Sequence, residues 1–310
     1  EASQHEPGTA LITHEGETLT YGDIGAFSGF LSKVIDERCI AFCLCSNTPG
    51  SLLGYMAFLA NRVVPVMLDE GTDADILTGL LHHYKPRYIW LPDSRVGFFT
   101  DVQVVFSRYQ YSLLKVPGND IYPLHKNLAL LLATSGSTGS SKFIRISYEN
   151  LESNAASIAE YLSIDRMERP VTTLPMSYSY GLSVINSHIL KGASILLTTK
   201  SIVEKTFWDF VSAFRATSIA GVPYTYRILD KLHLTQMELP ALKTLTQAGG
   251  KLNEELHMKF AKYCLGTGRK FFVMYGQTEA TARISYLPPQ YAIDKPGSIG
   301  VAIPGGEISL

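Results

Sequence analysis

From residue 128 onward, short apolar runs alternate with longer segments whose apolar residues recur at helical spacing. The runs that read as strands are LALLLAT (128–134), KFIRISY (142–148), VTTL (171–174), SILLTT (194–199), TSIAGV (217–222), LKTLTQ (242–247) and KFFVMY (270–275). The segments between them that read as helices are 147–164, 181–192, 203–216, 223–233 and 253–266. Strands separated by helices of this length predict a mainly parallel sheet covered on both faces.

The first 125 residues show a similar but less regular alternation, with helical patterns at 21–35 and 50–61 and strand-like runs at 41–46, 63–68 and 84–91. The polar stretch 116–127 is the best candidate boundary between two lobes. We therefore predict an α/β fold: mainly parallel sheets flanked by helices in a layered sandwich. Its two sub-lobes are predicted at residues 1–125 and 126–296.

The composition is that of a globular chain, with 46% hydrophobic and 18% charged residues and a net charge of -1. This near-neutral charge, with no basic stripe, argues against a nucleic-acid partner. The longest apolar stretch is interrupted by Asn61, Arg62 and Pro65, so we expect no membrane span. The N-terminus lacks a signal-peptide pattern and the four cysteines read as reduced structural thiols, which indicates a cytoplasmic protein.

Five polar motifs each follow a predicted strand. They are SGSTGSSK (135–142), PMSYSYG (175–181), GVPYTY (221–226), AGGK (248–251) and YGQTE (275–279). In an open parallel sheet, ligands bind beyond the carboxyl ends of the strands. We therefore expect the five motifs to lie on one edge of a single sheet and to form one surface.

The stretch ATSGSTGSSK (133–142) can be a linker, a hairpin loop or a phosphate-binding loop. A flexible linker has nothing to separate here, because the stretch lies tightly between two strand-like runs. Glycines let backbone N–H groups turn inward toward an anion, and hydroxyls and Lys142 add donors. A P-loop is disfavoured, since the spacing is wrong and a strand follows where a helix is needed. Phosphate binding is favoured, and a structural hairpin stays the alternative.

YGQTEAT (275–281) places an aromatic face, a hydroxyl and a carboxylate within five residues. Tyr275 has a face on which a base can stack, Thr278 can donate to a phosphate, and Glu279 can hold Mg²⁺ beside phosphate oxygens. A strand-end turn with a solvated Glu is the other interpretation.

SGSTGSSK, YGQTEAT and KPGSIGVAIPGGE (295–307) together resemble the signatures of the adenylate-forming superfamily, and GTALITHEGETLTYGDIGAFSGFLSKVI (8–35) is similar to its N-terminal opening. That superfamily includes acyl-CoA synthetases, acyl-AMP ligases, luciferases and peptide-synthetase adenylation domains. The resemblance implies activation of a carboxylate with ATP and Mg²⁺ to an acyl-adenylate. The acyl group then passes to a thiol of CoA or of a phosphopantetheine carrier, so an acyl carrier protein is a possible partner.

Carried over by motif, the resemblance assigns a role to each matching residue. The phosphate-wrapping residues would be Thr134, Ser135, Gly136, Ser137, Thr138, Gly139 and Lys142. The adenine site would comprise Gly249, Gly250, Lys251, Tyr275, Gly276 and Gln277. Thr278 and Glu279 would be catalytic, Thr278 contacting the α-phosphate and Glu279 ligating the metal. Tyr178, Tyr180 and Gly181 would line the substrate pocket.

Three residues depart from the family pattern. Ser141 stands where the family often has Pro, and Tyr178 where many members have His. No Asp follows Tyr180, where amino-acid-activating members keep a carboxylate for the substrate amine. The resemblance therefore favours a carboxylic acid without a required α-amine.

The family continues beyond a motif like PGGEISL (304–310) into a ribose-binding segment, a hinge and a small domain with a catalytic Lys. We therefore expect residues 297–310 to begin a truncated β-subdomain, the C-terminal catalytic domain to be absent, and the isolated fragment to be inactive. The first hypothesis is the N-terminal lobe of an AMP-forming acid–thiol ligase. The alternative is a non-catalytic nucleotide- or acyl-binding module of the same fold.

Overall fold

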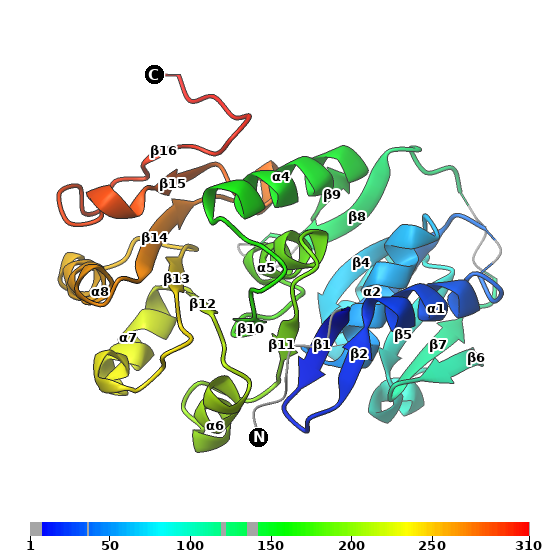
Figure 1. The fold of residues 1–310 in the computed structure, drawn as a ribbon. Coiled ribbons are helices and arrows are strands. Elements are labelled where there is room, and N and C mark those ends of the chain that lie inside the picture. Colours follow the sequence, from blue (N-terminus) through cyan, green and yellow to red (C-terminus); the bar gives the residue numbers. More distant parts are fainter. Residues whose placement is uncertain (1–7, 36, 119–121, 135–141, 310) are drawn as a thin grey trace. The chain divides into compact units, whose positions relative to one another are not determined.

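The computed structural model describes residues 8–35, 37–118, 122–134 and 142–309. The described residues form two compact units, each built around its own sheet (Figure 1). Unit 1 comprises those within Glu1–Thr18, Glu152–Leu174 and Ser179–Leu310, and unit 2 comprises those within Leu19–Leu151 and Pro175–Tyr178. The predicted α/β class with mainly parallel sheets is confirmed.

Within the described residues, the sheet of unit 1 has nine strands in the order β16-β15-β14-β13-β12-β10-β11-β1-β2. Its strands are β1 (Thr9–Thr13), β2 (Thr18–Thr20), β10 (Pro170–Val171), β11 (Ile195–Leu197), β12 (Ser218–Gly221), β13 (Thr244–Gln247), β14 (Lys270–Tyr275), β15 (Ser285–Leu287) and β16 (Val301–Ala302). β12, β13 and β14 pair in parallel, and β15 and β16 extend the sheet antiparallel at one edge.

Helices cover both faces of this sheet. They are α4 (Tyr148–Tyr161), α5 (Ser179–Leu190), α6 (Lys205–Ala213), α7 (Pro223–Lys231) and α8 (Glu254–Gly266), with short 3₁₀ turns η2 (Leu234–Gln236), η3 (Thr278–Ala280) and η4 (Pro289–Tyr291). Ser147 caps α4, because its Oγ accepts from the N–H of Asn150 at 3.1 Å.

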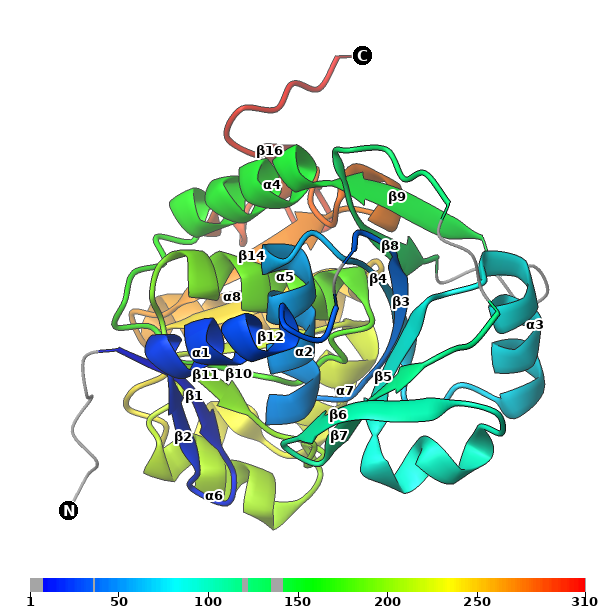
Figure 2. The same cartoon turned by 90° about the vertical axis from the view of Figure 1, so that its right-hand side faces the viewer.

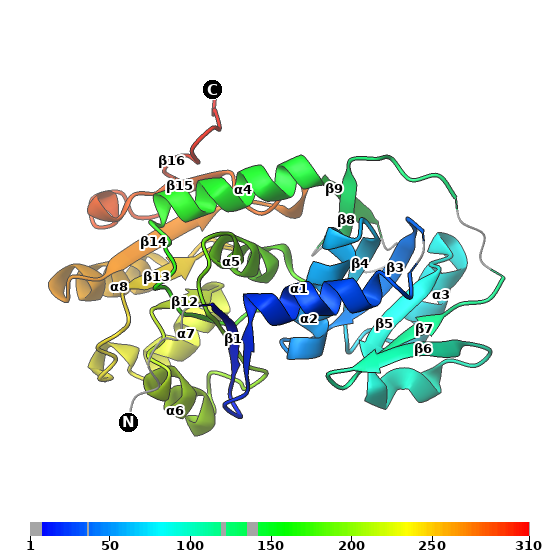
Figure 3. The ribbon, with the colours of Figure 1, turned by 45° about the vertical axis from the view of Figure 1, so that its right-hand side comes forward.

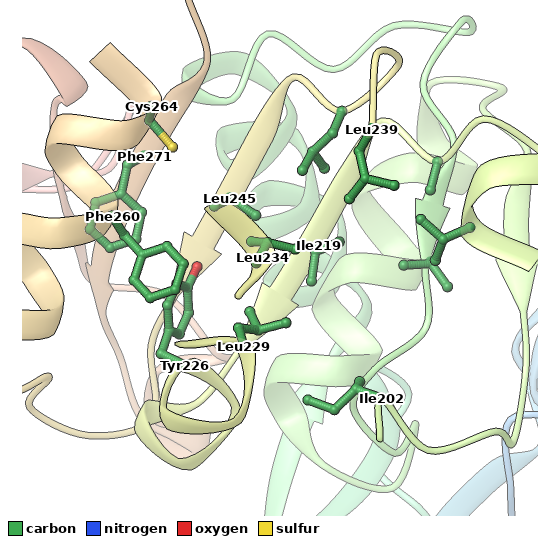
Figure 4. Close-up of a cluster of buried hydrophobic side chains, with 14 of the residues drawn as sticks. Ile202, Ile219, Tyr226, Leu229, Leu234, Leu239, Leu245, Phe260, Cys264 and Phe271 are labelled. Carbon is green, nitrogen blue, oxygen red and sulfur yellow. The ribbon is translucent and has the colours of Figure 1, made fainter. Parts of the chain in front are cut away.

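The two faces of unit 1 differ because side chains alternate along each strand. Ile219, Leu245 and Phe271 point toward α6, α7 and α8 and form a core with Tyr226 and Phe260 (Figure 4). All five are at most 2% exposed. The intervening residues of the same strands point toward α4 and α5. One face is therefore sealed by apolar packing, and the opposite face is available for a site.

Within the described residues, unit 2 has a seven-stranded sheet in the order β6-β7-β5-β3-β4-β8-β9. Its strands are β3 (Ile40–Cys45), β4 (Val64–Asp69), β5 (Tyr88–Pro92), β6 (Gln103–Arg108), β7 (Tyr111–Lys115), β8 (Leu128–Ala133) and β9 (Phe143–Ser147). Its helices are α1 (Tyr21–Leu31), α2 (Pro49–Ala60) and α3 (Ala74–Tyr84), with the 3₁₀ turn η1 (Asp93–Phe98). α2 and α3 cover opposite faces of this sheet (Figure 2), and α3 packs on Phe42 and Leu44 of β3.

The structure corrects the prediction that all five motif-bearing strands share one sheet. β8, which precedes the predicted phosphate loop, pairs with β4 in unit 2, and β9 pairs with β8 antiparallel. The division of the chain also differs from the predicted boundary at residues 116–127, because β8 and β9 complete the sheet of unit 2 (Figure 3).

The predicted strand 171–174 is shorter in the structure, where β10 ends at Val171. The next two residues join their neighbours through side-chain hydroxyls: Thr172 Oγ1 donates to the carbonyl oxygen of Thr198 at 3.2 Å, and Thr173 Oγ1 donates to that of Ala220.

The four cysteines, Cys39, Cys43, Cys45 and Cys264, are buried and form no disulfide. The part of the chain that the structure describes contains no cluster of three or more metal-binding side chains. None of its helices is long and apolar enough to cross a membrane.

Gly54 in unit 2 has no room for a side chain. Gly54 lies in α2 against the indole of Trp90, and a Cβ at this position would overlap the indole ring. Gly79 lies exposed in α3 with nothing within 4 Å of such a Cβ. We expect Gly54→Ala to lower the free energy of unfolding by about 1–3 kcal/mol through overpacking. Gly79→Ala should raise it by roughly 0.5–1 kcal/mol through helix propensity. Urea unfolding followed by circular dichroism checks both, and equal effects of the two changes would contradict the packing argument.

Candidate functional site

Three neighbouring strands of unit 1 end at one edge, and each is followed by a predicted motif. The parallel register pairs Gly221 of β12 with Gln247 of β13, and Gln247 with Val273 of β14. GVPYTY, AGGK and YGQTE therefore emerge side by side (Figure 1). This is the edge at which open α/β sheets bind ligands.

The AGGK segment is a tight loop that a hydrogen bond from the preceding strand holds in place. Gly249 and Gly250 have φ of +77° and +153°, conformations that favour glycine. A Cβ on Gly250 would lie 3.2 Å from Pro223 Cγ, so glycine also permits close approach to the start of α7. The buried Gln247 donates through Nε2 to the carbonyl oxygen of Gly250 at 2.8 Å. Gly249, Gly250 and Lys251 are consequently presented on the surface.

The YGQTE segment forms the turn between β14 and β15. Tyr275 is 43% exposed, which leaves its ring accessible for stacking. Gly276 has no room for a side chain, because a Cβ there would overlap the carbonyl of Ala282. Gln277 is exposed and its carbonyl accepts from the N–H groups of Ala280 and Ala282, at 3.1 and 3.2 Å, which closes the turn.

Thr278 and Glu279 have opposite surroundings in this turn. Thr278 is 7% exposed, and its Oγ1 donates to Ser179 Oγ at 3.2 Å, at the start of α5. Glu279 is exposed and forms no ion pair within the described residues. A single free carboxylate fits a Mg²⁺ site whose remaining ligands are phosphate oxygens and water, which is how Mg²⁺ is often held beside nucleotides.

Two residues shortly after Glu279 have strained backbone conformations. Thr281 has φ of 55° and Ala282 has φ of 88°, both in the left-handed region that side chains disfavour. The strand resumes with the N–H of Ile284 donating to the carbonyl of Tyr275 at 2.9 Å. Strained residues of this kind cluster at functional sites.

The substrate-pocket residues predicted in PMSYSYG are divided between the two units. Tyr180 and Gly181 are buried in the first turn of α5 in unit 1, and the Tyr180 hydroxyl hydrogen-bonds Thr246 Oγ1 at 2.8 Å. Tyr178 is half-buried and belongs to unit 2.

Thr134 and Lys142, the two described residues of the predicted phosphate loop, also belong to unit 2. Thr134 is half-buried at the end of β8, and Lys142 is exposed before β9. Ser135, Gly136, Ser137, Thr138 and Gly139 lie outside the described residues. The antiparallel pairing of β8 with β9 is compatible with both the phosphate-loop and the hairpin interpretations.

A cavity of about 30 Å³ lies inside unit 1, on the face of the sheet covered by α4 and α5. Tyr180 lines it, together with Ser183, Ser218, Thr244 and Thr246. Sequence reasoning missed two further lining residues, Arg283 and His188. No local pattern marks Arg283, because a basic residue in a polar loop reads as solvated. His188 is spaced eight residues from Tyr180 along α5 and so repeats on one helix face.

His188 is fully buried and uncharged in the folded chain. Burial lowers its pKa from 6.5 to about 4. The hydrogen bond to Val184 and the charge of Glu168 act in the opposite direction, because both favour the protonated form. Nδ1 lies 2.8 Å from the carbonyl oxygen of Val184, so Nδ1 carries the proton and donates it.

Two mainly parallel sheets with glycine-rich loops beyond their strand ends define an α/β protein suited to ligand binding at those ends. The family model described as AMP-binding enzyme matches residues 1–310. The chain belongs to this family.

Curated relatives and solved structures agree with this family. The chain is similar to a 2-succinylbenzoate--CoA ligase of Bacillus subtilis, at 24% identity over 321 residues, covering 99% of this chain and 64% of the ligase. It is 26% identical over 305 residues to an indigoidine synthase of Dickeya dadantii, covering 90% of this chain and 20% of the synthase. The crystal structure of ATP-bound MatB from Rhodopseudomonas palustris matches with a TM-score of 0.75 at 20% identity, covering 97% of this chain and 62% of that chain. The chain thus spans less than two thirds of the length of each.

The burial of His188 makes the stability of the folded chain depend on pH. Between pH 6.5 and about 4 the unfolded chain takes up a proton at this residue that the folded chain refuses. The stability contribution is therefore fully present above pH 6.5 and is lost as the pH falls through the folded value of about 4. His188→Asn keeps a donor for the Val184 carbonyl but does not titrate. We expect the wild-type chain to lose on the order of 2 kcal/mol relative to this variant between pH 7.5 and pH 5.

Urea unfolding at a series of pH values measures this difference. His82→Asn, which removes an exposed imidazole from α3, serves as the matched control. A difference between wild type and His188→Asn that is independent of pH would show that His188 is not held neutral by burial.

Proposed function

We propose that the chain carries the nucleotide- and acid-binding part of an AMP-forming ligase. The ligase would activate a carboxylic acid with ATP to an acyl-adenylate and pyrophosphate, for transfer to a thiol. The observation that carries the proposal is the placement of Gly249–Gly250, Tyr275 and Thr278 on adjoining strand ends of unit 1, in a chain of the AMP-binding enzyme family.

Each residue at this edge has a role that its surroundings allow. The exposed Tyr275 ring would stack on the adenine, and Gly249, Gly250 and Lys251 would line it without obstructing it. Thr278 would turn its hydroxyl from Ser179 to the α-phosphate, which keeps a buried donor satisfied in both states. Thr134 to Lys142 would bind the β- and γ-phosphates with backbone N–H groups and one ammonium.

Glu279 would hold Mg²⁺, which supplies positive charge where negative charge develops as pyrophosphate leaves. The carboxylate of the acid then attacks the α-phosphorus, and the bond to the β-phosphate oxygen breaks. Residues of this chain contribute mainly by orienting the acid and the nucleotide, which lowers the barrier by removing their freedom of motion.

The acid would lack a required α-amine, because the first turn of α5 offers Ser179, Tyr180 and Gly181 and no carboxylate. The thiol acceptor would be CoA or a carrier protein. CoA is supported by the name of the Bacillus subtilis relative, a 2-succinylbenzoate--CoA ligase. We also propose that the protein is cytoplasmic, as its sequence leads us to expect.

A non-catalytic nucleotide-binding module of the same fold is the alternative. The surface exposure of Glu279 without an ion pair favours the enzyme, since a carboxylate retained for binding alone needs no access to a metal. Acid-dependent exchange of pyrophosphate into ATP by the full-length protein distinguishes the two.

Lys142 tests the phosphate loop. Lys142→Ala should weaken ATP binding by about 1–3 kcal/mol, because a charge-assisted contact to phosphate is lost. Isothermal calorimetry measures the affinity. Lys126→Ala removes another exposed ammonium of unit 2 and should leave the affinity unchanged. Equal affinities for wild type and Lys142→Ala would support the structural-hairpin interpretation.

Glu279 tests the metal role. Glu279→Gln keeps the shape and removes the charge, so the Mg²⁺ concentration for half-maximal pyrophosphate exchange should rise at least about tenfold. Thermal unfolding should change little, because the side chain is exposed. Glu160→Gln, an exposed change on α4, is the control. A normal exchange rate with an unchanged Mg²⁺ requirement would exclude Glu279 as the ligand.

A further inference from the structure

Arg283 is a buried cation on the loop that joins η3 to β15. It is 4% exposed and lines the cavity of unit 1. A guanidinium keeps its charge in any protein environment. Placing such a charge in the interior is costly unless an anion or a full set of acceptors compensates it.

The observed contacts of Arg283 do not supply that compensation. Nη1 donates to the carbonyl of Ala282 at 3.1 Å, and the guanidinium lies 4.0 Å from the centre of the Tyr180 ring. It also lies against the Tyr161 hydroxyl, whose pKa burial raises and the Arg283 charge lowers. Nε makes no hydrogen bond. The attraction of a guanidinium to an aromatic face is smaller than the cost of removing its charge from water.

No carboxylate in the described part of the chain forms an ion pair with Arg283. Glu168 is the acid among the residues that line the cavity. Its Oε1 already accepts from Lys243 Nζ at 2.9 Å, and its Oε2 accepts from Thr217. The charge of Glu168 is therefore matched elsewhere.

The cavity beside Arg283 has the size of a small anionic group, and Arg283 is the cation among its mainly apolar lining residues. Its volume of about 30 Å³ admits one or two water molecules, or a group of similar size. Thr244 and Ser218 are among its polar lining residues. A long alkyl chain has no room there.

The cavity adjoins the residues proposed to act on the nucleotide. Tyr180, against whose ring Arg283 lies, follows Ser179, the hydrogen-bond partner of Thr278. The strained pair Thr281–Ala282 turns the chain between Glu279 and Arg283. A molecule whose reacting end is at Thr278 can therefore extend its other end toward Arg283.

We propose that the acid substrate carries a second anionic group, a carboxylate remote from the one that is activated, and that Arg283 binds it. This inference rests on the proposed function and specifies its substrate class as short dicarboxylic acids. Arg283 is then the specificity-determining residue, and the carboxylate would accept from Nε, which makes no hydrogen bond within the protein.

The experiment compares paired acids of equal length in pyrophosphate exchange by the full-length protein: butyrate with succinate, pentanoate with glutarate, and 3-methylbenzoate with isophthalate. Wild type should show kcat/KM at least about tenfold higher for the better diacids than for their partners. Arg283→Met should lower kcat/KM for diacids by about 100-fold, mainly through KM, because a charged contact is lost. Monoacid values should stay constant or rise. Arg283→Lys should restore part of the diacid activity, since charge returns without the planar fork.

Arg269→Met is the matched control. Arg269 is also a partly buried cation of unit 1, but Nε and Nη2 donate to the carbonyls of Leu242 and Leu239, each at 2.9 Å. It should lower stability and leave the acid preference unchanged. Equal losses for monoacids and diacids in Arg283→Met would overturn the inference and leave the proposed function intact. Absence of exchange with every acid in wild type would overturn both.

Binding of the paired acids to wild type by calorimetry, in the presence of ATP, supplies a readout that needs no variant. Tighter binding of the diacid than of its methyl-ended partner supports the inference even where Arg283→Met does not fold. Equal or weaker binding of all diacids would refute it.

Discussion

The in-register parallel pairing of β12, β13 and β14 is the constraint on which the rest of unit 1 depends. It aligns Ser218 with Thr244 and Ala220 with Thr246, so one side of the sheet presents a continuous band of small and hydroxylated residues. The opposite side presents Ile219, Leu245 and Phe271 to the apolar core. Because side chains alternate strictly, shifting any one strand by a residue would exchange the two faces. The cavity and the core are thus consequences of the same register.

The same pairing explains why a strained turn is tolerated. β14 is held by β13 on one side and by β15 on the other, so the ends of the turn are fixed. Within it, Gly276 lets the chain pass against the Ala282 carbonyl, and Thr281 and Ala282 adopt left-handed conformations. Such residues persist only where surrounding structure determines them. The energetic cost of these backbone conformations is confined to the turn. The turn directs Thr278 and Arg283 inward and leaves Glu279 exposed.

From β8 to β14 the sequence predicted the order of strands and helices, because alternating patterns depend on neighbouring residues alone. It could not assign strands to sheets. β8 reads as an apolar run like β12 or β13, and nothing local records that its partner is β4. β6 and β7 form an antiparallel edge and went unpredicted, because β6 is largely exposed and carries little periodic signal. Arg283 was missed for a related reason: a basic residue in a polar loop reads as solvated, and only the fold shows its burial.

The distribution of residues between the units has a consequence for specificity. Thr278, Tyr180, Arg283 and the cavity all belong to unit 1, whereas Thr134 and Lys142 belong to unit 2. Under the proposed function, one set of side chains thus selects the acid, and a separate set binds the β- and γ-phosphates. Changes that share no contacts usually add in free energy. The acid pocket can therefore diverge between relatives, by exchange at positions such as Arg283, while the phosphate loop keeps its chemistry.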